Sequence, residues 1–249
     1  MFNSIINIFT DKSEFIWFLL RIPVVLLALS FHEMSHAYTA YKMGDDTAKN
    51  LGRLTMNPLK HLDLVGSICL LLFGIGWAKP VPIMTRNFEN PKKGMVLTSL
   101  AGPASNVFLS IVAFILCVIF SVLFGYTDYL KVASEGFGSI FAFILCLFLY
   151  IFHTANLAYA IFNMLPVPPL DGSRLALAFL PDKFYFGIMR YERFIMIGFL
   201  ILMYVIGFSW LSSLIYLISD GLFSLVSLIP GLEGVKTIPD VLFYFLGNI

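Results

Sequence analysis

Four apolar stretches limit what this chain can fold into, because each is long enough to cross a bilayer as a helix. We place them at Phe15–Met43, Met95–Phe124, Ser139–Leu165 and Phe194–Ser219. Hydrophobic residues make up 59% of the chain and charged residues 12%, about half the charged share of a soluble domain. The sequence therefore predicts an all-α polytopic membrane protein with about four to six transmembrane helices, in a single membrane-embedded domain over residues 1–249.

Three further apolar segments are too short to cross a bilayer. Leu64–Ala78 contains several glycines, and we expect a re-entrant hairpin that enters and leaves on one side. Leu222–Ile229 and Val241–Ile249 are expected to lie at the interface or to pack against the bundle.

The basic residues are divided unevenly between the loops. If the hairpin is re-entrant, most Lys and Arg residues fall on one side, and the opposite side receives only Lys12, Lys131 and Lys236. An excess of basic loop residues marks the cytoplasmic side, so both termini should face outward. The net charge of +1 gives no electrostatic argument for nucleic-acid binding.

The first apolar stretch contains a His-Glu-x-x-His pattern made by His32, Glu33 and His36. Residues i and i+4 share one face of a helix, so both imidazoles can reach one Zn²⁺ ion. Glu33 then flanks the same ion, where it can act as acid and base. Two histidines buried in a core are the alternative. Ionisable groups at membrane depth are costly unless they are partnered, so the metal site is favoured.

The expected topology brings the polar motifs Gly102–Asn106 and Asn163–Asp171 to the depth of the two histidines. Asp171 is therefore the expected third ligand, which would make a catalytic rather than a structural zinc site. The alternative for Asp171 is a capping residue that opens a short helix. His153 competes as third ligand, but its depth favours a buried histidine that bonds a neighbouring helix.

Two other groups of possible ligands have simpler explanations. His61 and Asp63 could form a metal pair, but a turn with an N-cap at Asp63 accounts for both. Cys69, Cys117 and Cys146 show no paired spacing. We expect them to be small core residues rather than disulfide partners or zinc ligands.

These motifs resemble the site-2 proteases, which are zinc metalloproteases that cut peptide bonds within the membrane. The resemblance covers residues from about 15 to 220 and is closest to the short bacterial branch, without PDZ or CBS modules. The matching segments are His32–His36, Gly102–Asn106, Asn163–Gly172, Trp77–Pro82 and Gly52–Pro58.

The resemblance implies an intramembrane metalloendopeptidase with one Zn²⁺ per chain. His32, His36 and Asp171 would be its ligands and Glu33 its catalytic acid and base. The enzyme would lie in the bacterial inner membrane with its active site toward the cytoplasm. It would cut a transmembrane protein or peptide substrate in the lipid bilayer, and a regulatory membrane partner is possible. A zinc carrier or zinc-dependent scaffold without proteolysis is the alternative. The chain has one polar cluster and no second one across the bilayer, which favours the protease.

Asn106 and Asn163 are expected to serve the substrate, because a carboxamide can donate to a developing oxyanion or hold the scissile backbone. The alternative for both is a hydrogen bond to a neighbouring helix. Lys79–Asn87 contains two prolines and should form an extended loop near the active site. Its Val81, Ile83 and Thr85 would offer an edge for a substrate strand, or the loop would only seal the protein.

Overall fold

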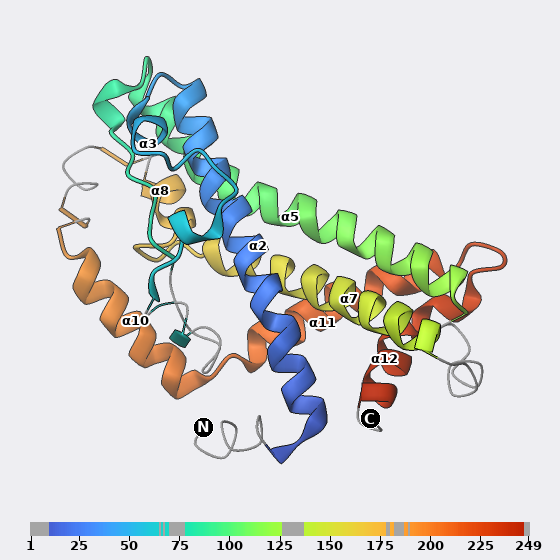
Figure 1. The fold of residues 1–249 in the computed structure, drawn as a ribbon. Coiled ribbons are helices and arrows are strands. Elements are labelled where there is room, and N and C mark those ends of the chain that lie inside the picture. The colour runs from blue at the N-terminus through green and yellow to red at the C-terminus, as the bar shows by residue number, and fades with distance from the viewer. Residues whose placement is uncertain are drawn as a thin grey trace.

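The computed structural model describes residues 10–64, 66, 68, 69, 78–125, 137–177, 180, 181, 187, 188 and 190–246. Figure 1 shows its helices, which are α2 (Lys12–Lys42), α3 (Thr47–Asn50), α5 (Pro91–Leu123), α7 (Phe137–Asn163), α8 (Asp171–Leu177), α10 (Glu192–Ile206), α11 (Ser209–Val226) and α12 (Ile238–Leu246). Short 3-10 turns lie at Pro58–Lys60, Thr85–Asn87 and Glu233–Thr237. Among the described residues α2, α5, α7 and α11 are long and apolar enough to cross a membrane. The predicted all-α polytopic membrane fold is confirmed.

Helix α2 carries the two histidines and has clear signals at both ends. Asp11 caps its start, since Oδ1 accepts a hydrogen bond from Ser13 N–H at 2.8 Å. The helix ends at Lys42, and Gly44 follows with φ +104°, a conformation that side chains other than glycine rarely adopt. The end predicted at Met43 is therefore confirmed to within one residue.

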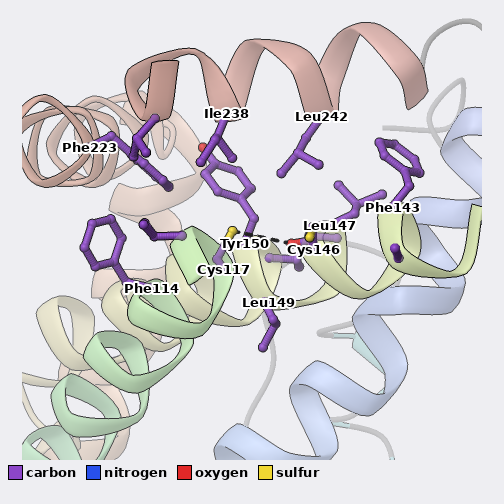
Figure 2. Close-up of a cluster of buried hydrophobic side chains, with 14 of the residues drawn as sticks. Phe114, Cys117, Phe143, Cys146, Leu147, Leu149, Tyr150, Phe223, Ile238 and Leu242 are labelled. Carbon is purple, nitrogen blue, oxygen red and sulfur yellow. Dashed lines mark hydrogen bonds between the residues drawn. The ribbon is translucent and has the colours of Figure 1, made fainter. Parts of the chain in front are cut away.

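The bundle is built around α5, which packs against both α2 and α7. A buried cluster in the N-terminal half of α7 joins α5, α7, α11 and α12. In Figure 2, Ile238 and Leu242 of α12 point toward Leu147 and Tyr150 of α7. The two cysteines of this cluster, Cys117 and Cys146, are fully buried free thiols, as predicted. Cys69 is half-buried and also free.

The prediction of one span over Phe194–Ser219 is wrong. The chain forms α10 and then α11, and Figure 1 shows that the two helices run in different directions. Gly207 ends α10 with φ +80°, which interrupts the helical hydrogen bonding. The segment Leu222–Ile229 is not a separate piece, since residues 222–226 complete α11, but it packs against the bundle as expected, with Phe223 in the buried cluster. The last apolar piece packs against the bundle as expected, but its helix starts earlier, at Ile238.

Most of the predicted re-entrant hairpin at Leu64–Ala78 lies outside the described residues. Its flanks meet, because Leu62 and Ala78 form an antiparallel bridge. His61 bonds its own turn through Nε2, which lies 2.7 Å from the carbonyl oxygen of Thr55. Asp63 Oδ1 accepts from Gly66 N–H at 2.8 Å. The turn and the cap at Asp63 are therefore confirmed.

Candidate metal centre

His32, His36 and Asp171 converge on one point. The histidines lie one turn apart on α2, and Asp171 is the first residue of α8. The two Nε2 atoms are 3.1 Å apart, and Asp171 Oδ2 lies 3.1 Å from His32 Nε2 and 3.2 Å from His36 Nε2. Both histidines are buried. Three residues far apart in the chain thus form a group that could hold a metal ion.

The other ring nitrogen of each histidine faces an acceptor. His36 Nδ1 lies 2.6 Å from the carbonyl oxygen of Thr98, and His32 Nδ1 lies 2.6 Å from Asn106 Oδ1. Both Nδ1 atoms must therefore carry the proton and donate it, which leaves the Nε2 lone pairs directed toward Asp171. This is the arrangement in which metal-binding histidines are held by outer partners.

Three acceptor atoms facing one another require a cation. Asp171 Oδ2 is buried and accepts no hydrogen bond within the described part of the chain. One proton could bridge only one pair of the three atoms, whereas one divalent cation would serve all of them. A tetrahedral zinc site with bonds of about 2.0–2.1 Å sets its ligand atoms about 3.3–3.4 Å apart, close to the distances found here. The residues present fit zinc.

Gly102 of α5 makes room for the two imidazoles. A Cβ atom at this position would lie 2.4 Å from His36 Nε2 and 2.6 Å from His32 Cε1. Gly172 plays a similar part for Asp171, since its Cβ would lie 2.2 Å from the carbonyl oxygen of Met164 at the end of α7. Because neither glycine has a side chain, the backbone of α5 can lie against the imidazoles and the start of α8 can lie against Met164. This allows the three ligands to come together.

We expect Gly102→Ala to displace the imidazoles and to lower the metal content of the purified protein, because the new methyl group overlaps both rings. Metal analysis of the purified variant checks this. Gly198→Ala is the matched control, since a Cβ at Gly198 in α10 meets nothing within 4 Å. Full metal content in Gly102→Ala would show that the ligands can move aside and would contradict the expectation.

An extended segment, residues 78–84, runs beside Glu33, and we call it the strap. Val81 N–H donates to Glu33 Oε2 at 3.0 Å, and both residues are buried. Pro80 and Pro82 flank Val81 and have no N–H of their own, so this stretch of backbone cannot continue a helix. The predicted extended loop near the site is confirmed, and its backbone orients the carboxylate.

Two charged side chains outside the candidate spans anchor the strap. Arg53 Nη2 donates to the carbonyl oxygens of Lys79 and Pro80. Asp45 Oδ2 accepts from Met84 N–H at 2.7 Å. Burial opposes ionisation of Asp45, but the hydrogen bonds that it accepts hold its pKa below the usual value. Asp45 therefore stays ionised as an acceptor at neutral pH.

The strap is shorter than predicted. Thr85 belongs to a 3-10 turn, in which Asn87 N–H donates to the carbonyl oxygen of Met84 at 2.9 Å. The predicted strand edge is therefore wrong at Thr85. Val81 N–H is also taken, since it donates to Glu33. Of the three residues proposed for that edge, Ile83 makes no backbone hydrogen bond to another described residue. It also lines the cavity described below.

Asn106 and Asn163 occupy different environments. Asn106 is fully buried and its Oδ1 faces His32. Asn163 is half-buried at the end of α7, lines the cavity described below, and donates from Nδ2 to the carbonyl oxygen of Tyr159 at 3.0 Å. Contact of either residue with a substrate stays a prediction.

His153 lies away from the metal group, as expected. Its Nδ1 is 2.8 Å from Ser110 Oγ on α5, and its Nε2 is 3.1 Å from Ser219 Oγ on α11. It is almost fully buried. The prediction of a histidine that bonds neighbouring helices is confirmed.

A cavity of about 640 Å³ adjoins the metal group. Glu33, the strap, the C-terminal end of α7, α8, much of α10 and the start of α11 form its walls. The volume is within the range of ligand pockets, and the walls are mostly apolar with a few polar groups, as is typical of such pockets. The polar side chains that line it outside the metal group and Glu33 are Ser99, Tyr159, Asn163, Arg174 and Glu192.

Sequence reasoning missed one partner of His36, the carbonyl of Thr98, and one residue, Asn156, that contacts the partner of His32. The carbonyl of Thr98 leaves no signal in a sequence, because every residue has one. Asn156 on α7 donates no bond to a ligand but contacts Asn106, whose Nδ2 lies 2.8 Å from Asn156 Oδ1. A signal existed for Asn156, since a carboxamide inside an apolar span is itself a functional candidate.

The fold and site define an integral membrane protein with a candidate metalloprotease centre. A family model, Peptidase family M50, matches residues 20–206, and this chain belongs to that family, the site-2 protease family. The chain is 42% identical over 181 residues to "Putative zinc metalloprotease YwhC" of Bacillus subtilis, covering 72% of this chain and 78% of that one.

More distant relatives are also named putative zinc metalloproteases. Rip2 of Mycolicibacterium smegmatis is 30% identical over 160 residues, which cover 62% of this chain and 55% of that one. MJ0611 of Methanocaldococcus jannaschii is 31% identical over 159 residues, which cover 64% and 69% of the two chains. No solved structure matches this chain.

Proposed function

We propose that this protein is a zinc-dependent intramembrane protease that hydrolyses a peptide bond in or near a transmembrane segment of a membrane-protein substrate. The observation that carries the proposal is the triangle of His32, His36 and Asp171 beside Glu33, in which both histidines are buried on α2, a helix long enough to cross a bilayer. Membership of family M50 and the names of the relatives support a zinc metalloprotease.

Zinc would be held by His32, His36 and Asp171, and when bound it supplies Lewis acidity that makes water more acidic and polarises a carbonyl. Glu33 takes the proton from the attacking water and delivers it to the leaving amine. Its Oε2 is fixed by Val81 N–H, and no bond to Oε1 is found among the described residues. Oε1 therefore serves as the proton acceptor.

The substrate must be extended where it is cut, because a helix keeps its carbonyls in internal hydrogen bonds. The strap supports such a state, since it is itself extended and Ile83 lines the cavity. The Ile83 backbone pairs with the substrate strand, and Asn163 donates from its second amide hydrogen to the developing oxyanion. Asn106 also orients His32.

The enzyme lies in the bacterial inner membrane with its active site toward the cytoplasm. His36 lies close to the end of α2 at Lys42, and the polar loops that follow carry much of the basic charge of the chain. Basic loops mark the cytoplasmic side.

Removal of zinc should abolish cleavage reversibly. The protein, reconstituted in lipid vesicles with a transmembrane peptide that has a helix-breaking glycine pair near its cytoplasmic end, is assayed before and after chelation. We expect no cleavage without metal and recovery when about one zinc per chain is returned, because the three ligands complete a catalytic site. A water-soluble peptide with the same sequence around the cut site is the comparison. If the protein cuts it as well as the membrane peptide, the proposal of a membrane substrate is contradicted.

A zinc carrier would use the same ligands. Measuring both zinc flux and peptide cleavage in the same vesicles distinguishes a carrier from a protease. Zinc appearing inside sealed vesicles without peptide cleavage would favour the carrier. Cleavage without zinc flux would favour the protease.

A further inference from the structure

We infer that Asn156 is a positioning residue for His32 and acts through Asn106; this inference rests on the proposed zinc site. Asn156 on α7 and Asn106 on α5 are both fully buried, and Asn106 Nδ2 donates to Asn156 Oδ1 at 2.8 Å. Asn156 Nδ2 donates to the carbonyl oxygen of Phe152 at 2.8 Å. A chain of hydrogen bonds therefore links the α7 backbone to the imidazole of His32 on α2.

The carbonyl of Phe152 sets the direction of this chain, because a carbonyl oxygen can only accept. Asn156 must turn its NH₂ group toward Phe152 and its Oδ1 toward Asn106. Asn106 must then turn its NH₂ group toward Asn156 and its Oδ1 toward His32, where it accepts from Nδ1–H at 2.6 Å. A reversed Asn106 would set two oxygens against each other at one end and two N–H donors at the other, a costly arrangement in a buried site.

His32 is thereby held with its proton on Nδ1 and its Nε2 lone pair toward Asp171 and His36. A metal ion binds the lone pair and not the protonated nitrogen, so fixing this tautomer favours metal binding. The other contact of Asn106 Nδ2, to the carbonyl oxygen of Ala28, is 3.5 Å long and too weak to hold the orientation alone.

A purely structural role for Asn156 would be to tie α5 to α7. The structure provides a second tie between the same helices, in which Ser110 Oγ lies 2.8 Å from His153 Nδ1. This tie does not touch His32 or Asn106. Breaking it separately distinguishes loss of packing from loss of orientation.

The test compares zinc affinity in the full chain in detergent, measured by competition with a chelator. Asn156→Leu keeps the approximate shape and removes both polar groups, and we expect its affinity to fall about 10–100-fold, the usual effect of losing an outer partner of a ligand. Asn156→Asp keeps an oxygen that accepts from Asn106 and should bind zinc nearly as tightly as the unchanged protein. Ser110→Ala should bind zinc with unchanged affinity.

The second readout is the tautomer of His32 in the metal-free protein, followed by nitrogen-15 NMR of labelled histidine, which is practical because the chain has four histidines. We expect the proton on Nδ1 in the unchanged protein and in Asn156→Asp, and a mixture of tautomers in Asn156→Leu. Thermal unfolding of each metal-free form reports its packing. If Asn156→Leu does not fold, Asn156→Ser, which is too short to reach both partners, replaces it.

Unchanged zinc affinity with His32 still protonated on Nδ1 in Asn156→Leu would overturn the inference. Equal losses of affinity in Asn156→Leu and Ser110→Ala, or in Asn156→Leu and Asn156→Asp, would overturn it as well, since packing alone would then explain them. An unchanged protein that binds no zinc would instead contradict the proposed function. The NMR comparison would still decide whether Asn156 sets the tautomer of His32.

Discussion

Asp171→Ala is expected to lose its zinc and, with it, all measurable cleavage. Asp171 Oδ2 lies 3.1 and 3.2 Å from the two imidazole nitrogens and accepts no hydrogen bond among the described residues. Removing it leaves two ligands, so the fall in zinc affinity should exceed the roughly 10–100-fold cost of losing an outer partner. Metal analysis of the purified variant and chelator competition measure the effect.

His153→Gln is the control for this variant. His153 is also a histidine buried between helices, but it bonds Ser110 and Ser219 rather than the ligands. Its replacement should leave the zinc content unchanged. Full zinc content in Asp171→Ala together with loss of zinc in His153→Gln would show that the third ligand has been assigned wrongly.

Glu33→Gln should keep its zinc and lose cleavage by about two to four orders of magnitude, the usual contribution of a general acid and base. The amide oxygen of glutamine can still accept from Val81 N–H, so the strap should stay in place. The group that is lost is the proton acceptor. Turnover of the transmembrane peptide and zinc content are measured on the same preparation.

Glu14→Gln makes the same chemical change on the same helix, at an exposed position in the first turn of α2. It should retain both zinc and turnover. Near-normal turnover in Glu33→Gln would refute the role of Glu33 as acid and base. Loss of zinc in that variant would mean that Glu33 holds the metal rather than the proton.

The helices that cross the membrane could be predicted because apolar length is a local property. Helices α2, α5 and α7 lie within a few residues of their predicted bounds. The break at Gly207 was missed, because a glycine within an apolar run is compatible both with a helix and with the φ of +80° that ends one here. The spacing of His32, Glu33 and His36 on one face also follows from helical periodicity alone.

By itself the sequence determined that two histidines and a glutamate share one face of a membrane helix, because the helical repeat fixes the directions of neighbouring side chains. Only the tertiary structure decided how the site is held. Thr98 and Asn106 fix the proton on each imidazole from α5, and the approach at Gly172 brings Asp171 to the histidines. These contacts join residues distant in the chain, so they depend on how the helices pack, which no local pattern encodes.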